Sequence, residues 1–142
     1  MSGKKFFLAV LVAFLVTMAT GFIVHGLLLG EDYKALGSHM RDEQGQAAHF
    51  PFMLIAHVVL AVGVAWIYGK GVEGTSWVGQ GLRFGIALWL VASAGPYLIY
   101  FAVQPLPGGL VAKQIVYGFF ENLILGLALA SLYRTRAGAA AA

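Results

Sequence analysis

Four long apolar segments constrain this chain more than any other feature of its sequence. The first runs from Phe6 to Leu29 without an Asp, Glu, Lys or Arg. Three further apolar segments cover about residues 52–69, 79–103 and 110–133. A helix needs about 20 mainly apolar residues to cross a bilayer, and all four segments are close to this length. The sequence predicts an all-α integral membrane protein, in which residues 1–142 form one domain, an antiparallel four-helix transmembrane bundle.

The composition supports a lipid environment. The chain is 60% hydrophobic and only 11% charged, whereas soluble domains carry roughly 25% charged residues. So little polar surface cannot cover a soluble globule, so we expect the lipid bilayer to be the main partner. The chain has no cysteine, which excludes disulfides and thiolate metal sites. No basic run suggests a nucleic-acid partner.

The first apolar segment has two interpretations. Lys4 and Lys5 followed by an apolar run resemble a secretory signal peptide, and residues 17–19 resemble a cleavage site. The apolar run continues for ten residues beyond that point, to Leu29. We therefore expect an uncleaved spanning helix over residues 6–29.

The distribution of basic residues predicts the orientation. The two ends of the chain and the segment around residues 70–83 carry six basic residues, and the opposite side carries three. The six are Lys4, Lys5, Lys70, Arg83, Arg134 and Arg136, and the three are Lys34, Arg41 and Lys113. Since basic residues favour the cytoplasmic side, we expect both termini in the cytoplasm and the polar segment 30–51 outside. Residues 137–142 are expected to form a tail after the last helix.

Polar side chains inside the apolar segments are the candidate functional residues. At 1.5 Å per residue, His25 lies about 6 Å and His57 about 7–8 Å from the outer ends of their helices. Six polar residues of the last two segments fall between a similar depth and the midplane. They form the predicted polar core cluster: Tyr97, Tyr100, Gln114, Tyr117, Glu121 and Asn122. An ionisable group at such a depth usually faces other protein groups or water.

Three specific functions are compatible with these polar residues. A b-type haem needs two imidazoles at matching depth on different helices, and His25 and His57 satisfy that condition. The same pair, with a carboxylate from the outer segment, could instead hold a divalent metal whose geometry the sequence does not constrain. Alternatively, Glu121 could be the titrating group of a proton or small-solute path.

A structural or accessory role is the alternative that the sequence favours. Polar side chains would then be interhelical hydrogen bonds, and the bundle would pack in a homo-oligomer or in a larger membrane complex. The sequence does not favour an enzyme, because it contains no hydrolase or transferase motif.

Three short motifs carry a resemblance to a known class of proteins. They are Val24-His25-Gly26, the stretch from Gly79 to Gly85, and Leu132-Tyr133-Arg134. With them the chain resembles small bacterial four-helix membrane proteins of uncharacterised function. The resemblance implies four spans in a bacterial cytoplasmic (inner) membrane. It implies no activity and assigns no functional residue.

Overall fold

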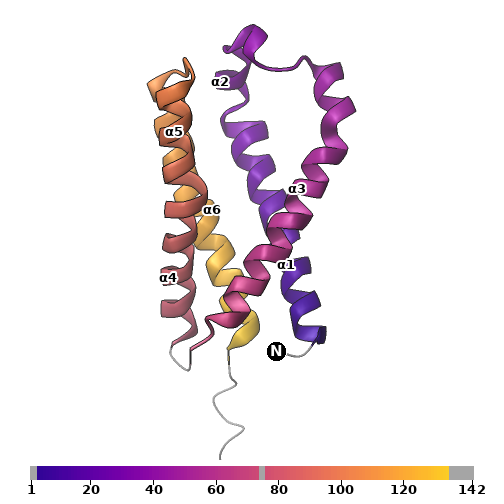
Figure 1. Cartoon of the computed structure of the whole chain (residues 1–142), viewed down its shortest axis with the longest axis vertical. Helices are drawn as coiled ribbons and strands as arrows, with labels where there is room; N and C mark the ends of the chain where they lie inside the picture. The colour runs from indigo at the N-terminus through magenta and orange to yellow at the C-terminus, as the bar shows by residue number, and fades with distance from the viewer. Residues whose placement is uncertain (1–2, 74–75, 135–142) are drawn as a thin grey trace, which may run out of the picture.

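Four long helices run side by side, alternately up and down, in the computed structural model, which describes residues 3–73 and 76–134 (Figure 1). The first is α1 (Gly3–Gly21) with its π-helical continuation η1 (Phe22–Leu28), and the second is α3 (Glu43–Lys70). The third consists of α4 (Trp77–Trp89), the π-helical η3 (Leu90–Ala94) and α5 (Gly95–Val103), and the fourth is α6 (Gly108–Tyr133). Between the first two lie α2 (Gly30–Lys34) and the 3₁₀ turn η2 (Gly37–His39).

The all-α prediction is confirmed for the described residues. Each of the four helical segments is long and apolar enough to cross a membrane. Three of them start and end within a few residues of the expected positions, at Gly3–Leu28, Trp77–Val103 and Gly108–Tyr133. The expected tail at residues 137–142 lies outside the described residues.

The second helix begins earlier than the sequence interpretation placed it. α3 starts at Glu43 rather than at residue 52, so Pro51 lies inside the helix. The reason is an N-cap: the Asp42 carboxylate accepts a hydrogen bond of 2.7 Å from the Gly45 amide, which satisfies one of the free donors of the first turn. Pro51 removes only the bond that its own N–H would have made. The polar segment 30–51 therefore comprises α2, η2 and the first turns of α3.

The closest packing in the fold joins α4 to α6. A Cβ added at Gly85 would lie 2.7 Å from the carbonyl oxygen of Asn122, and one added at Gly126 would collide with the Gly81 carbonyl. Only glycine allows the two backbones to approach so closely, as is common between membrane helices. Trp89 adds an indole hydrogen bond of 2.9 Å to the Ile115 carbonyl across the same interface.

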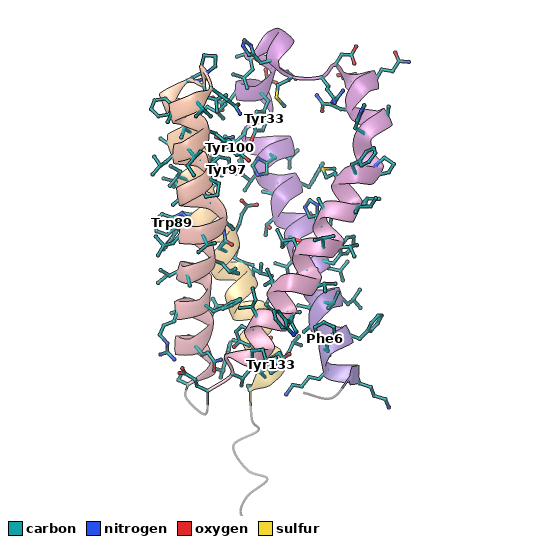
Figure 2. All side chains as sticks on the ribbon, in the orientation of Figure 1. Phe6, Tyr33, Trp89, Tyr97, Tyr100 and Tyr133 are labelled. Atoms are coloured by element: carbon teal, nitrogen blue, oxygen red, sulfur yellow. The ribbon has the colours of Figure 1, made fainter. Side chains whose placement is uncertain are left out.

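An apolar core fills the half of the molecule opposite α2. Small residues from three helices are fully buried there, together with Leu129. They are Ala9 and Ala13 of α1, Ala61 and Ala65 of α3, and Ala130 of α6. Tyr68 closes this core and meets the Phe84 ring edge-on, with 4.9 Å between ring centroids. Figure 2 shows Phe6 and Tyr133 at this end of the molecule and Tyr33 at the other.

The helices separate toward the other end, which carries α2 and is called here the α2 end. α3 packs against α1, and the two helices are still close at His57, whose Nε2 would lie 3.7 Å from a Cβ on Gly21. Beyond that point α3 leans away from the other helices (Figure 1). Its apolar side chains there are exposed, with Phe52 at 67% and Ile55 at 58%.

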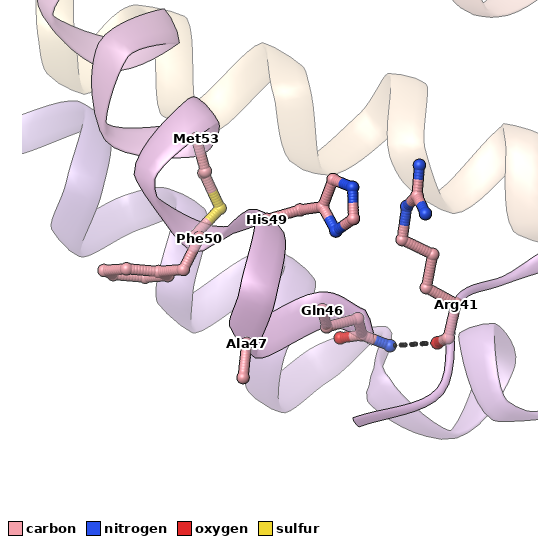
Figure 3. A pocket seen from close by; sticks show the side chains of 6 residues that line it. All are labelled: Arg41, Gln46, Ala47, His49, Phe50 and Met53. Carbon is pink, nitrogen blue, oxygen red and sulfur yellow. Dashed lines mark hydrogen bonds between the residues drawn. The ribbon is translucent and has the colours of Figure 1, made fainter. Parts of the chain in front are cut away.

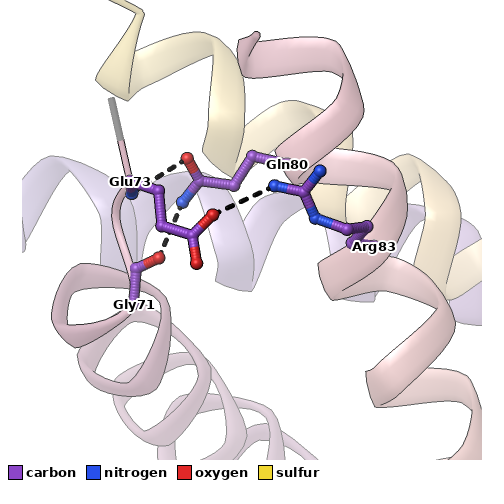
Figure 4. Close-up of polar contacts among 4 residues, drawn as sticks. All are labelled: Gly71, Glu73, Gln80 and Arg83. Carbon is purple, nitrogen blue, oxygen red and sulfur yellow. Dashed lines mark hydrogen bonds and ion pairs between the residues drawn. The ribbon is translucent and has the colours of Figure 1, made fainter. Parts of the chain in front are cut away.

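The turn between α3 and α4 is closed by a buried amide. Gln80 is only 7% exposed, and its Nε2 donates to the Gly71 carbonyl at 2.9 Å. Its Oε1 accepts from the Glu73 amide at 3.2 Å. Arg83 forms an ion pair with Glu73 at 3.2 Å, with both side chains largely exposed (Figure 4).

Replacing Gln80 with leucine is expected to lower the free energy of unfolding by about 1–2 kcal/mol, because two backbone groups of the turn lose their partner. Arg83→Gln is expected to change it by less than about 1 kcal/mol, because exposed ion pairs contribute little. Denaturant titration of the purified protein in detergent measures both values. A larger loss in Arg83→Gln than in Gln80→Leu would contradict this assignment.

Candidate functional site

A chain of hydrogen bonds at the α2 end joins three helices through the hydroxyl of Tyr33. Nε2 of Gln114, on α6, donates to the Tyr33 oxygen at 3.1 Å. The same hydroxyl lies 2.6 Å from Nδ1 of His25, on η1. The hydroxyl can both donate and accept, so it joins the amide and the imidazole in either tautomer of His25. We call His25, Tyr33 and Gln114 the tyrosine relay.

The tyrosine relay contains an incomplete polar group. The Gln114 side chain is only 7% exposed, and its Oε1 is a buried polar atom without a hydrogen-bond partner among the described residues. Exchanging the amide nitrogen and oxygen would leave a buried donor unpartnered instead. Either arrangement costs about 1–3 kcal/mol when nothing binds there. The free end of this amide therefore marks a position where a partner is missing.

An ion pair holds α2 against α6 beside the relay. Nζ of Lys113 donates to both carboxylate oxygens of Asp32, at 2.8 and 2.9 Å. Lys113 and Gln114 are neighbours on α6, and Asp32 and Tyr33 are neighbours on α2, so α2 and α6 meet through two adjacent pairs. This pairing accounts for the lysine and the glutamine at the start of the last apolar segment.

The π-helix η1 carries His25. Its wider turn is visible in the bond from the Leu29 amide to the Val24 carbonyl, 2.9 Å long and five residues apart. π-helical turns are rare in proteins, and those that occur often lie at functional sites. A second one, η3, precedes Pro96, which lies in the first turn of α5. Nothing in the sequence pattern alone indicates either π-helix.

A cavity of about 550 Å³ opens beside the relay, between η1, α2 and the start of α3. His25 and Tyr33 line it from one side. Its remaining lining residues are mostly polar or small and include Arg41, Asp42, Glu43 and Gln46. This volume lies in the range of small-molecule pockets.

Glu121 lies deeper on α6 and is half-buried. Its carboxyl group lies close enough to the Thr20 hydroxyl of α1 and to His57 of α3 to interact electrostatically with both. The Glu121 carboxylate also interacts electrostatically with Tyr33 and Tyr97. Glu121 therefore belongs to the same polar region as the tyrosine relay and lies between three of the long helices.

The other members of the predicted polar core cluster lie elsewhere. Asn122 donates to Ser93 at 3.1 Å and to the Gly118 carbonyl at 2.7 Å, within the third and fourth helical segments. Tyr100 is 47% exposed, and its ring contacts that of Tyr97 at 6.5 Å between centroids. Tyr117 packs on the apolar residues Val24, Leu29 and Leu110.

The sequence interpretation missed Tyr33, Asp32 and Thr20. Tyr33 was interpreted as part of a surface helix, because nothing local shows that α2 folds back over α6. The useful signal was the pair Asp32-Tyr33, which offers an acid and a hydroxyl to the pair Lys113-Gln114. Complementary neighbours of this kind become visible only when the two segments are already known to meet.

The two histidines proposed for haem or metal each have one ring nitrogen engaged. His57 Nδ1 bonds to the Met53 carbonyl at 2.8 Å, and His25 Nδ1 bonds to Tyr33. In both rings Nε2 takes no part in these bonds. In the part of the chain that the structure describes, no group of three or more His, Cys, Asp or Glu side chains is placed to hold a metal ion. Haem ligation by this pair stays a prediction.

Residues 8–130 match the model of a protein family described as "Protein of unknown function (DUF1761)". The chain belongs to this family. The match contains the whole tyrosine relay and most of each long helix of this DUF1761 member. It confirms the expected resemblance to an uncharacterised family, and it assigns no activity. No curated protein and no solved structure matches the chain.

Proposed function

We propose that the chain is a small integral membrane protein that binds a small hydrogen-bonding ligand at the tyrosine relay, from the outer side of the membrane. The observation that carries the proposal is the buried Gln114 Oε1 without a partner. A bound N–H or O–H group would remove the cost of leaving this oxygen free. Gln114 is not among the residues that line the cavity beside His25 and Tyr33, so a molecule bound there would have to extend past Tyr33 to reach this oxygen.

The apolar half of the molecule favours binding over a continuous path. Between Glu121 and the end of the molecule opposite α2, the buried core consists of alanine, valine and leucine side chains and is closed by Tyr68. A proton or solute would find no partner there. Glu121 therefore fits better as the deepest group of a site that opens at the α2 end.

The unpartnered Gln114 Oε1 favours ligand binding over a purely structural or accessory role. Interhelical hydrogen bonds alone would explain the Tyr33–Gln114 and Asn122–Ser93 contacts. They would leave the second end of the buried amide unexplained. Since hydroxyl and ammonium groups can donate both to an amide oxygen and to a carboxylate, we infer a ligand that carries such donors and reaches toward Glu121.

Binding is tested by matched substitutions of two buried glutamines. The protein and its Gln114→Leu and Gln80→Leu variants are purified in mild detergent, and bound small molecules are identified by native mass spectrometry. We expect the parent and Gln80→Leu to carry the same small polar molecule and Gln114→Leu to lose at least nine-tenths of it. A parent protein without such a molecule, or equal amounts in all three, would refute the proposal.

The orientation is tested separately, because the chain contains no cysteine. Gln44→Cys and Lys70→Cys place single thiols near opposite ends of α3. In intact cells a membrane-impermeant maleimide is expected to label residue 44 and to leave residue 70 unlabelled until the membrane is permeabilised. Labelling of residue 70 alone would reverse the orientation, and equal labelling of both without permeabilisation would contradict a spanning α3.

A further inference from the structure

A second cavity lies on the far side of Arg41 from the relay. It has a volume of about 600 Å³ and is lined by Arg41, Gln46, Ala47, His49, Phe50 and Met53 (Figure 3). All but Arg41 belong to the first three turns of α3. The cavity therefore combines one basic side chain and an imidazole with apolar side chains on a single short stretch of helix.

Arg41 is a cation without an acidic partner among the described residues. The ion pairs that the structure shows there use Lys34, Arg83 and Lys113 instead. The adjacent acids Asp42 and Glu43 line the other cavity, beside the relay, and no acid lines this one. The guanidinium therefore offers its donors to a ligand in this cavity.

His49 adds a second polar group beside the guanidinium. Its Nδ1 lies 2.7 Å from the Gly45 carbonyl, which can only accept, so Nδ1 carries a proton and the ring orientation is fixed. Figure 3 shows the imidazole and the guanidinium extending to the same side of α3. Gln46 fixes the backbone between them, because its Nε2 donates to the Arg41 carbonyl at 2.7 Å.

The apolar residues lie one helical turn deeper. Met53 follows His49 by four residues and Phe50 by three, so its side chain neighbours each of theirs on the surface of α3. Phe50 and Met53 are each 45% exposed. An elongated molecule with its charged group at Arg41 would lie with its apolar part along these two side chains.

The length of α3 places this face at the membrane boundary. About 20 residues of helix span the hydrocarbon layer, so counting from Lys70 the layer ends near residue 50. Arg41 and His49 then lie among the lipid headgroups, and Met53 lies in the hydrocarbon. The two chemical halves of the cavity match the two halves of a lipid molecule at the corresponding depth.

We propose that this cavity binds an anionic phospholipid of the outer leaflet, with its phosphate held by the Arg41 guanidinium, other polar atoms of its headgroup beside His49, and an acyl chain along Phe50 and Met53. Planar guanidinium groups are well suited to phosphate. The proposal shares the membrane setting of the proposed function but concerns a different ligand. The two cavities share Arg41 and Gln46, whereas Phe50 lines only this one, so Phe50→Gln separates the two proposals.

The test compares lipids and two charge-removing substitutions on the same helix. The full chain in detergent is titrated with phosphatidylglycerol or phosphatidylcholine, and bound lipid is counted by native mass spectrometry. We expect at least a fivefold preference for phosphatidylglycerol in the parent. Arg41→Gln should abolish this preference, and Lys70→Gln, which removes the same charge at the other end of α3, should keep it. Phe50→Gln should weaken the binding of phosphatidylglycerol.

Three outcomes would overturn the proposal. They are equal binding of the two lipids by the parent, an unchanged preference in Arg41→Gln, and an equal loss of preference in Arg41→Gln and Lys70→Gln. A further arm adds inorganic phosphate at matched ionic strength. Displacement of phosphatidylglycerol by phosphate, but not by chloride, would identify a site for free anions and overturn the assignment to a lipid. Circular dichroism of each variant confirms that the helices are retained.

Discussion

Replacing Gly126 with alanine is expected to lower the free energy of unfolding by about 3 kcal/mol, the upper part of the usual cost of overpacking. The new methyl group would meet the Gly81 carbonyl and lie 2.9 Å from the Gly85 nitrogen. These are backbone atoms of α4, so α4 and α6 must move apart. That separation would stretch the bond from Trp89 to the Ile115 carbonyl. Denaturant titration followed by circular dichroism measures the loss.

Gly63→Ala is the matched control for this substitution. Gly63 also lies inside a long helix, but a Cβ added there has no atom within 4 Å. Alanine is favoured over glycine in a helix by roughly 0.5–1 kcal/mol, so this variant should be slightly more stable than the parent. Similar changes in both variants would show that close approach of α4 and α6 does not determine the stability.

Replacing Tyr33 with phenylalanine is expected to cost about 2 kcal/mol of folding free energy. The substitution removes the hydroxyl that joins His25 to Gln114, and the buried Gln114 amide then loses the only side-chain partner that it has among the described residues. A buried polar group without a partner costs about 1–3 kcal/mol. Tyr100→Phe serves as the control, because Tyr100 is 47% exposed. Equal stability of Tyr33→Phe and Tyr100→Phe would contradict a central role of the Tyr33 hydroxyl.

The Tyr33 hydroxyl also predicts how stability changes at alkaline pH. Burial raises the pKa of Tyr33 above its usual value, the hydrogen bond from Gln114 lowers it in part, and the charges of Glu121 and Asp32 raise it further. The folded protein therefore holds this proton more tightly than the unfolded chain. The resulting stabilisation is complete below about pH 10, the usual tyrosine pKa, and is lost as the pH rises through the folded pKa. Alkaline unfolding should therefore depend less on pH in Tyr33→Phe than in the parent.

Most of the fold could be predicted from hydropathy alone. Runs of 20 or more apolar residues have few ways to satisfy their backbone other than as helices, and short polar connections make neighbouring helices antiparallel. The start of α3 was placed too late because Pro51 was taken as the first helical residue. Asp42 sets the boundary instead. Its side chain caps an amide of the first turn, and the residues that follow can continue the helix.

The candidate site was predictable only in part. Gln114, His25 and Glu121 could be singled out because each is polar within an apolar segment. Their common partner could not, because Tyr33 belongs to a short element whose position depends on contacts between residues 81 positions apart. The contact of Asn122 with Ser93 could not be predicted for a related reason. Helical spacing gives the face on which a side chain lies, but it does not say which helix that face meets.

The uneven attachment of α3 has a mechanical consequence. The part of α3 after His57 is packed into the apolar core through its alanines. The part from Glu43 to His57 extends away from this core with little lateral support. The 14 residues from His57 to Glu43 span about 21 Å. A tilt of only about 10° would therefore move the start of α3 by roughly 4 Å and change the width of the cavity beside the relay, while the core residues keep their neighbours. Small movements at the anchored end are thus amplified where a ligand would enter.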